Sequence, residues 1–227
     1  SILNEVKDKV PPEVFTTPYK NPVGGTPQAG RDNLRQAIAL LKEAGYELKG
    51  NRMVEAKSGR PFSFEILLSS ATLERVALPY AQNLKKIGID ARVRTVDPSQ
   101  YTNRTRAFDY DMTWIVWGET LSPGNEQIDQ WGSRAAKEPG SRNYAGIADA
   151  GVDALIEKVI FAKDRKALVA ATKALDRVLL AHNFVVPLYY KKDMTIAYWD
   201  KFERPAELPT YGIGFPDIWW SKTAAAK

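Results

Sequence analysis

Hydrophobic and polar positions follow two different periods along this chain, and the two periods alternate. Some segments repeat apolar residues every three or four positions, as amphipathic helices do, and others are short runs of β-favouring residues. The predicted helices cover residues 32–44, 72–87, 98–107 and 126–131, and two more begin at Asp149 and Asp164. The predicted strands cover residues 62–68, 89–96, 112–117, 184–190 and 194–199.

Local signals fix several of these helix ends. Asp97 precedes Pro98, which is a strong helix start because the aspartate caps the helix and proline suits its first position. Gly45 and Gly88 follow apolar-periodic segments and predict helix stops. Pro79 lies inside the helix of residues 72–87 and should bend it. Aspartates are the predicted N-caps of the helices that begin near Asp32, Asp149 and Asp164.

The organising stretch is residues 112–117, an unbroken β-favouring run that ends at Gly118. Such a run suits a strand that is buried on both faces of a sheet covered by helices. The alternation of helix and strand predicts right-handed crossovers and a mainly parallel sheet. We expect an α/β fold with residues 112–117 in the centre of the sheet and residues 62–68 and 89–96 beside them.

The long segment from residue 118 to 148 is the place to look for a functional site. Loops of that length are uncommon in compact domains unless they are functional, and ligands of open α/β sheets bind beyond the carboxyl ends of the strands. The candidate ligand-binding residues are Trp114, Trp117, Gly118, Glu119, Glu126, Arg142 and Tyr144.

Each candidate also has a structural interpretation. Trp114 and Trp117 could belong to the core of the sheet, and this alternative is stronger for Trp114. Glu119 and Glu126 could be solvated carboxylates of the loop. Arg142, with its neighbours Asn143 and Tyr144, could pin the loop instead of contacting a ligand.

Composition excludes several function classes. The 227 residues contain no cysteine, which removes thiol catalysis, cysteine-bound zinc and disulfides. The formal net charge is +5, but basic and acidic residues are interspersed. The sequence therefore has no cluster of basic residues of the kind that binds nucleic acid. His182 is the only histidine, and no nucleophile or metal motif accompanies it. We expect no enzymatic activity, no cofactor and no metal.

The two ends of the sequence differ from its middle. Residues 1–30 contain five prolines, which excludes a long helix or a central strand and predicts an extended connector. Residues 201–227 contain a cluster of large aromatics that no later element covers. An aromatic cluster of this kind needs a surface to bury against. The amino end has no apolar run that would form a signal peptide.

Several stretches, in order along the chain, resemble the carboxy-terminal lobe of the peptide-binding proteins of ABC importers. These stretches are Leu40-Leu-Lys-Glu-Ala-Gly-Tyr46, Pro61-Phe-Ser-Phe-Glu-Ile-Leu67, Leu84-Lys-Lys-Ile-Gly-Ile-Asp90, Phe108-Asp-Tyr-Asp-Met112 and Asn183-Phe-Val-Val-Pro-Leu-Tyr189. Further stretches resemble the Yej-type branch, which is associated with uptake of oligopeptides and microcin C. They include Ser122-Pro-Gly-Asn-Glu-Gln127 and Tyr211-Gly-Ile-Gly-Phe-Pro-Asp-Ile-Trp219.

This resemblance implies an exported, periplasmic protein with two lobes that close over an oligopeptide and deliver it to a membrane permease. Residues 1–30 would be a connector from an amino-terminal lobe outside this chain, residues 31–200 the carboxy-terminal ligand-binding lobe, and residues 201–227 the return segment. The signal peptide would lie outside this chain. The aromatic tail, with part of residues 1–30, would pack on the missing lobe.

The family usually places a carboxylate after the tryptophan that ends the strand, where it holds the amino group of the peptide. Here the sequence after Trp117 departs from the family pattern in length and in using glutamate. The amine role therefore goes to Glu119, with Glu126 as the competing candidate. Two alternative hypotheses remain: the protein binds a non-peptide solute such as an oligosaccharide, or it is an α/β hydrolase.

Overall fold

The computed structural model describes residues 2–189, 193–210 and 212–222. The chain divides into two compact units, Ser1–Val186 and Pro187–Lys227, which we describe separately. The first unit contains the sheet, the long helices and all seven candidate residues. The boundaries predicted for the lobe, at residues 31 and 200, stay predictions.

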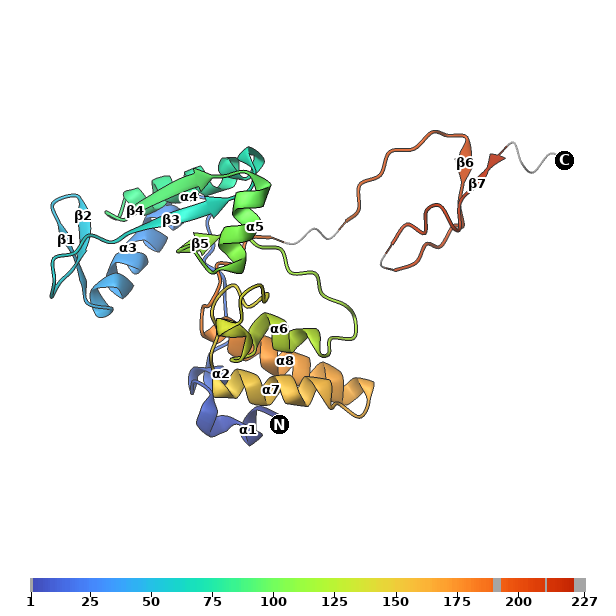
Figure 1. Ribbon diagram of the computed structural model, residues 1–227, viewed down its shortest axis with the longest axis horizontal. Helices are drawn as coiled ribbons and strands as arrows, with labels where there is room; N and C mark the ends of the chain where they lie inside the picture. Colours follow the sequence, from blue (N-terminus) through green and yellow to red (C-terminus); the bar gives the residue numbers. More distant parts are fainter. Residues whose placement is uncertain (1, 190–192, 211, 223–227) are drawn as a thin grey trace. The chain divides into compact units, whose positions relative to one another are not determined.

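The central feature of the first unit is a three-stranded parallel sheet (Figure 1). Its strands are β3 (Ser63–Leu68), β4 (Asp90–Thr95) and β5 (Met112–Thr113), in the order β4-β3-β5. β3 pairs with β4 over its full length, and Ile66 and Leu67 pair with Met112 and Thr113. The prediction of an α/β fold with a mainly parallel sheet is confirmed.

The prediction that residues 112–117 form the central strand was wrong. β3 is central, and β5 is an edge strand of two residues, both only partly buried. The chain leaves the ladder after Thr113 because its next groups bind elsewhere. The carbonyl of Trp114 accepts a hydrogen bond of 2.7 Å from the Tyr101 hydroxyl, and the Trp117 ring packs against Trp131. Apolar content alone did not reveal these competing contacts.

Two helices connect the strands of this sheet. α4 (Glu74–Lys85) joins β3 to β4 and contains Pro79, as the sequence predicted. It packs on the sheet through Ala77, next to the buried Ile66 and Leu68. α5 (Pro98–Arg106) joins β4 to β5, and Asp97 caps it by accepting hydrogen bonds from two backbone N–H groups.

The segment before the sheet differs from the prediction in two ways. α3 covers Pro27–Glu43 and begins at Thr26, not Asp32, because the Thr26 hydroxyl accepts a hydrogen bond of 3.1 Å from the N–H of Ala29. A hairpin of β1 (Tyr46–Lys49) and β2 (Arg52–Glu55) follows, which was not predicted. Gly50 has a φ of +59° in its turn, a conformation that favours glycine.

A second core lies among the remaining helices of the first unit. α6 (Glu126–Trp131) is short. α7 (Ala150–Ile160) and α8 (Arg165–Ala181) are longer and pack side by side (Figure 1). Asp149 and Asp164 cap α7 and α8, as predicted. The core between them contains Leu155 and Val178, both fully buried.

The amino-terminal segment covers part of this second core. α1 (Ile2–Glu5) and α2 (Glu13–Thr16) are short helices, and Val6, Val10 and Val14 are buried in the cluster formed with α7 and α8. Residues 17–25 contain no helix or strand. The short 3₁₀ helices of the unit are η1 (Lys7–Lys9), η2 (Ala71–Leu73) and η3 (Ala135–Lys137).

The second unit has a small antiparallel pairing of β6 (Phe202–Glu203) with β7 (Trp220–Ser221). Its aromatic side chains pack on one another, with 5.7 Å between the ring centroids of Phe215 and Trp219. The strands predicted at residues 184–190 and 194–199 are absent from their described parts, and residue 190 lies outside the described residues. The apolar runs alone did not determine whether these segments pair as strands.

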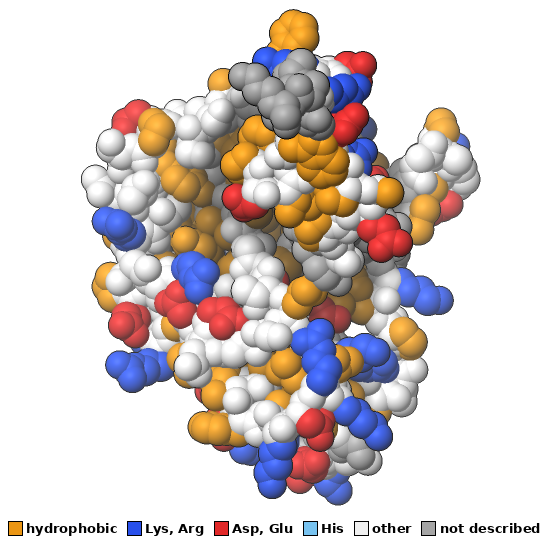
Figure 2. Space-filling view, turned by 90° about the vertical axis from the view of Figure 1, so that its right-hand side faces the viewer, with side chains coloured by type: hydrophobic (Ala, Val, Ile, Leu, Met, Phe, Trp, Pro, Cys, Tyr) orange, Lys and Arg blue, Asp and Glu red, His pale blue; other side chains and the backbone are white. Residues whose placement is uncertain are grey.

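Charged groups are mixed on the surface. Figure 2 shows Lys and Arg side chains interspersed with Asp and Glu on the face drawn. Among the described residues, no helix is long and apolar enough to cross a membrane.

Candidate functional site

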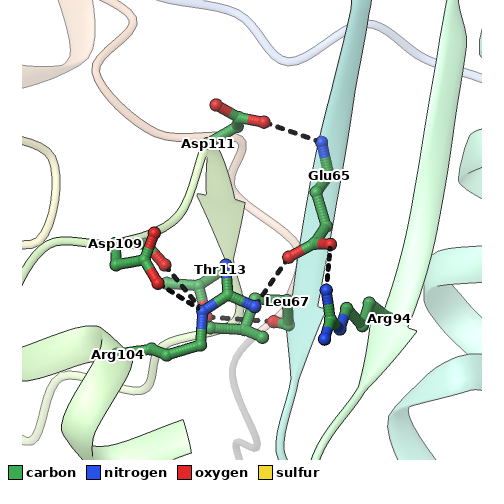
Figure 3. A network of polar contacts seen from close by, with 7 residues as sticks. All are labelled: Glu65, Leu67, Arg94, Arg104, Asp109, Asp111 and Thr113. Atoms are coloured by element: carbon green, nitrogen blue, oxygen red, sulfur yellow. Dashed lines mark hydrogen bonds and ion pairs between the residues drawn. The ribbon is translucent and has the colours of Figure 1, made fainter.

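β5 and the residues that lead into it are held in place by a network of polar contacts (Figure 3). The guanidinium of Arg104 on α5 donates from Nη1 to Oε1 of Glu65 at 2.8 Å and from Nε to the Asp109 carboxylate at 2.9 Å. The Asp111 carboxylate accepts a hydrogen bond of 2.9 Å from the backbone N–H of Glu65. The Thr113 hydroxyl donates to the carbonyl of Leu67 at 3.0 Å. These contacts fasten a two-residue strand to β3 and fix the start of the following loop.

Beyond this anchor, the backbone of residues 115–119 is unpaired. Within the described part of the chain, no hydrogen bond reaches a backbone N–H or C=O of these five residues. Val116 has 83% of its surface exposed, and nothing lies within 4 Å of the position that a Cβ would take on Gly118. The segment therefore offers a row of free donors and acceptors.

Trp117 begins an aromatic cluster on one side of this segment. Its ring centroid lies 4.9 Å from that of Trp131 on α6 and 6.2 Å from that of Tyr144. Its Nε1 donates a hydrogen bond of 3.3 Å to the carbonyl of Arg142. Trp117 therefore leaves the core of the sheet and holds the loop against α6.

A side-chain amide connects the cluster to the carboxylate that follows. Gln127 is buried in the first turn of α6, its Nε2 donates to Oε2 of Glu119 at 2.9 Å, and its Oε1 accepts from Nε1 of Trp131 at 3.1 Å. Gln130, one turn along the buried face, has no hydrogen-bond partner for its side-chain amide among the described residues.

The two candidate carboxylates differ in protonation chemistry. Burial raises the pKa of Glu119, and the nearby Glu126 adds to this, although the amide of Gln127 opposes it. Burial of Glu126 acts in the same direction, but the hydrogen bonds from the N–H of Gly124 and other donors outweigh it and lower the pKa of Glu126. The Glu126 carboxylate is thus already hydrogen-bonded to the backbone of the turn that precedes it. Glu119 has a neutral amide as its partner and no ion pair among the described residues.

The segment around Arg142 pins the loop. Arg142 forms an ion pair of 2.7 Å with Asp129, and this contact raises its pKa. Asn143 is fully buried, and its side chain makes three hydrogen bonds of 2.8–2.9 Å, to the carbonyl of Gly132 and to both backbone groups of Ile147. The carbonyl of Tyr144 accepts from the Tyr110 hydroxyl at 2.8 Å.

The structure thus brings five of the seven candidates together around α6: Trp117, Glu119, Glu126, Arg142 and Tyr144. Trp114 packs instead beside Ile66 and Leu68 in the core of the sheet. Gly118 lies in the exposed loop between them. The role of all seven in ligand binding stays a prediction.

Sequence reasoning missed two members of this arrangement, Gln127 and Trp131. Their separation by four residues, at the start of a predicted helix, places both on one helix face and could have identified them. His182 is the C-cap residue of α8, its Nε2 lies 3.4 Å from the Asp149 carboxylate, and its ring stacks on that of Phe184. No group of residues that could hold a metal ion occurs within the described ranges.

A cavity of about 430 Å³ adjoins Glu119. Its walls come from the loop of residues 119–123, from Gln127 and Trp131 on α6, and from one face of α8. No motif in the sequence indicated that α8 faces the loop.

Comparison with known proteins identifies the family. The family described as "Bacterial extracellular solute-binding proteins, family 5 Middle" matches residues 2–139. The chain is 76% identical over 223 residues to the y4wM protein of Sinorhizobium fredii, and 60% identical over 223 residues to a probable peptide-binding protein, YejA, of Agrobacterium fabrum. Each alignment covers 98% of this chain, but only 34% and 36% of those relatives. The chain therefore spans about a third of the length of these curated relatives.

A solved structure has a similar fold. The oligopeptide-binding protein AppA from Bacillus subtilis, in complex with a nonapeptide, is 23% identical and superposes with a TM-score of 0.58. The similarity covers 66% of this chain and 30% of AppA. The fold, and the family match over more than half of the residues, lead to one conclusion: the chain belongs to the bacterial extracellular solute-binding proteins, family 5.

Proposed function

We propose that this chain is the carboxy-terminal lobe of the substrate-binding component of an ABC importer, and that it captures oligopeptides. The loop after β5 would hold the amino-terminal part of an extended peptide. The 60% identity to a probable peptide-binding protein supports this assignment.

The unpaired backbone of residues 115–119 is the observation that carries the proposal. An extended peptide can add to such a segment as a strand adds to a sheet edge, with main-chain hydrogen bonds that do not depend on the peptide's side chains. Free backbone groups beside a fixed strand end suit a ligand with a regular backbone better than one without it.

Glu119 supplies the second part of the site. It follows the unpaired segment directly, and its partner is an amide instead of a cation. A peptide's amino group would provide the missing positive charge. A hydrogen bond between charged groups of this kind contributes about 1.5–3 kcal/mol. Glu126 is the weaker candidate, because it already accepts from the N–H of Gly124 at 2.7 Å.

The remaining aromatic and cationic candidates would shape the site. Trp117 and Tyr144 would line the groove with their exposed ring areas, and Gly118 would let a ligand backbone approach closely, since a Cβ there meets no other atom. Arg142 would act through its carbonyl and its ion pair with Asp129, which hold Trp117 and the loop in place. Trp114 would support the strand end from the core of the sheet.

The same proposal includes the partners of the chain. An amino-terminal lobe of the same protein would close over the ligand, and a membrane permease would receive it. Lobe closure in binding proteins is a hinge motion that excludes water from the ligand. We place the complete protein in the periplasm, as a binding protein without enzymatic activity, and microcin C is a peptide antibiotic that it could carry.

Native mass spectrometry of the full two-lobed protein, purified from its host without denaturation, tests this function. We expect a bound mass that fragments into amino-acid residues and is released on unfolding. A co-purifying oligosaccharide would support the alternative instead. If a purified peptide mixture were hydrolysed, or if no peptide bound at all, the proposal would be overturned.

A further inference from the structure

The cavity beside Glu119 is built from parts of the chain that are far apart in sequence. The loop of residues 119–123, with Gln127 and Trp131 of α6, forms one wall, and the face of α8 from Arg165 to Leu179 forms the other. Its volume of about 430 Å³ lies within the range of about 300–1,000 Å³ that ligand pockets occupy. It is therefore large enough for a side chain that belongs to a bound ligand.

The walls of the cavity are mainly apolar. Trp131 lines one side, and Leu168, Leu175 and Leu179 line the other. The three leucines lie on one face of α8 because they are separated by seven and four residues. An aliphatic stem would be buried against these side chains, which favours binding by about 25 cal/mol for each Å² of apolar surface removed from water.

Two carboxylates, Glu119 and Asp176, line the same cavity. The carboxylate of Asp176 has no hydrogen bond and no ion pair among the described residues, and although the residue is exposed to solvent, partial desolvation at the cavity raises its pKa. Two lysine or arginine side chains also line the cavity. Arg165 donates to the carbonyl of Leu121 and to the Ser122 hydroxyl, which occupies its guanidinium, and Lys173 is exposed to solvent. Neither forms an ion pair with Glu119 or Asp176.

We propose that this cavity receives the side chain of the ligand's first residue and favours a side chain with an aliphatic stem and an ammonium end, as in lysine. This inference rests on the proposed function. The amino group of that residue would bind Glu119, the stem would lie against the leucines of α8, and the ammonium would bind Asp176. One residue would then neutralise both unpaired carboxylates of the cavity.

Three tripeptides separate the contributions. Lys-Ala-Ala, norleucine-Ala-Ala and Ala-Ala-Ala differ in the first side chain alone, and norleucine has the stem of lysine without its charge. We expect calorimetry with the full protein to show Lys-Ala-Ala binding roughly tenfold tighter than norleucine-Ala-Ala, the effect of one charged hydrogen bond. Norleucine-Ala-Ala should in turn bind tighter than Ala-Ala-Ala.

Two variants and one control assign the preference to the cavity. Asp176→Asn should bring the ratio between the lysine and norleucine peptides close to one. Glu157→Gln removes a carboxylate from the exposed side of α7 and should leave the ratio unchanged. Thr172→Trp fills the cavity from α8 and should abolish the advantage of both long side chains over alanine, whether or not it alters stability.

The outcomes distinguish this inference from the function on which it rests. Equal affinities for the lysine and norleucine peptides in the unmodified protein would overturn the lysine pocket while leaving peptide binding intact. A lysine preference that persists in Asp176→Asn, with the fold confirmed by circular dichroism, would also overturn it. Failure of all three peptides to bind would overturn both.

Discussion

The side-chain amide of Gln127 fixes the carboxylate of Glu119, with 2.9 Å between Nε2 and Oε2. The other end of the same amide accepts a hydrogen bond from the indole of Trp131. Because an amide is planar and both of its ends are engaged, Gln127 cannot rotate without losing a contact. The proposed amine-binding group is therefore held in one orientation before any ligand arrives.

Binding of peptides with free amino groups should depend on pH through Glu119. The ionised carboxylate binds an ammonium group, and burial, with a contribution from Glu126, raises the pKa at which Glu119 loses its charge, while Arg142 opposes this. Affinity for Ala-Ala-Ala should therefore fall as the pH is lowered, starting above the ordinary glutamate range. Calorimetry over a pH series measures this. A decline only within or below the ordinary range, or an equal decline for acetyl-Ala-Ala-Ala, would contradict the assignment.

Removing the amide should shift that profile. Gln127→Met deletes the hydrogen bond that helps to lower the pKa of Glu119, so the pKa should rise further and the decline should begin at a higher pH. Affinity for free-amine peptides at neutral pH should fall roughly two- to tenfold, the value of one ordinary hydrogen bond. Gln100→Met, on the exposed first turn of α5, is the control. An unchanged pH profile in Gln127→Met would argue that this amide does not position Glu119.

The long loop should depend on Asn143 for its conformation. Asn143→Ala leaves the buried backbone N–H and C=O of Ile147 without partners, whereas the carbonyl of Gly132 keeps its hydrogen bond from the N–H of Ala135. Each unsatisfied group costs about 1–3 kcal/mol, so the free energy of unfolding should fall by at least that amount. Urea denaturation measures the change. A loss of less than about 0.5 kcal/mol, the range of ordinary surface substitutions, would show that the loop is held by other contacts.

Much of the fold follows from local sequence signals. Aspartates at residues 97, 149 and 164 cap helices where the sequence places them, since an N-cap depends on neighbouring residues alone. The prediction of a central strand at residues 112–117 was wrong because the position of a strand in a sheet depends on residues far away in the sequence. Its position in the sheet depends on Tyr101 and Trp131, whose contacts with it no local pattern reveals.

The residues of the candidate site also fall into those that local sequence signals identify and those that only the folded structure reveals. Trp117, Glu119 and Glu126 could be named as candidates because Trp117 ends the predicted strand and the two glutamates lie in the glycine-containing loop after it. Asp176 could not, since its carboxylate lies on a regular amphipathic helix and becomes a cavity residue only when the loop folds over α8. Arg142 was a candidate either for contacting a ligand or for pinning the loop, and its carbonyl and its ion pair with Asp129 make the contacts that pin the loop.

Amide hydrogen exchange should follow the observed sheet order. The slowest exchange is expected in β3, which is paired on both sides, and fast exchange in residues 115–117. Arg104→Met removes the contacts to Glu65 and Asp109 and should speed exchange in β5. Arg92→Met breaks only an exposed pair with Asp90 and should not. Equal effects of the two substitutions on β5 would contradict the role of the network in Figure 3.

The central claim is that Glu119 binds the amino group of a peptide, and one measurement tests it most directly. The affinities of Ala-Ala-Ala and acetyl-Ala-Ala-Ala are compared in the full protein with and without Glu119→Gln. We expect the substitution to weaken the free-amine peptide roughly 10- to 150-fold, equivalent to about 1.5–3 kcal/mol, and to change the acetylated peptide little. An equal loss for both peptides, or no loss for either, would contradict the account.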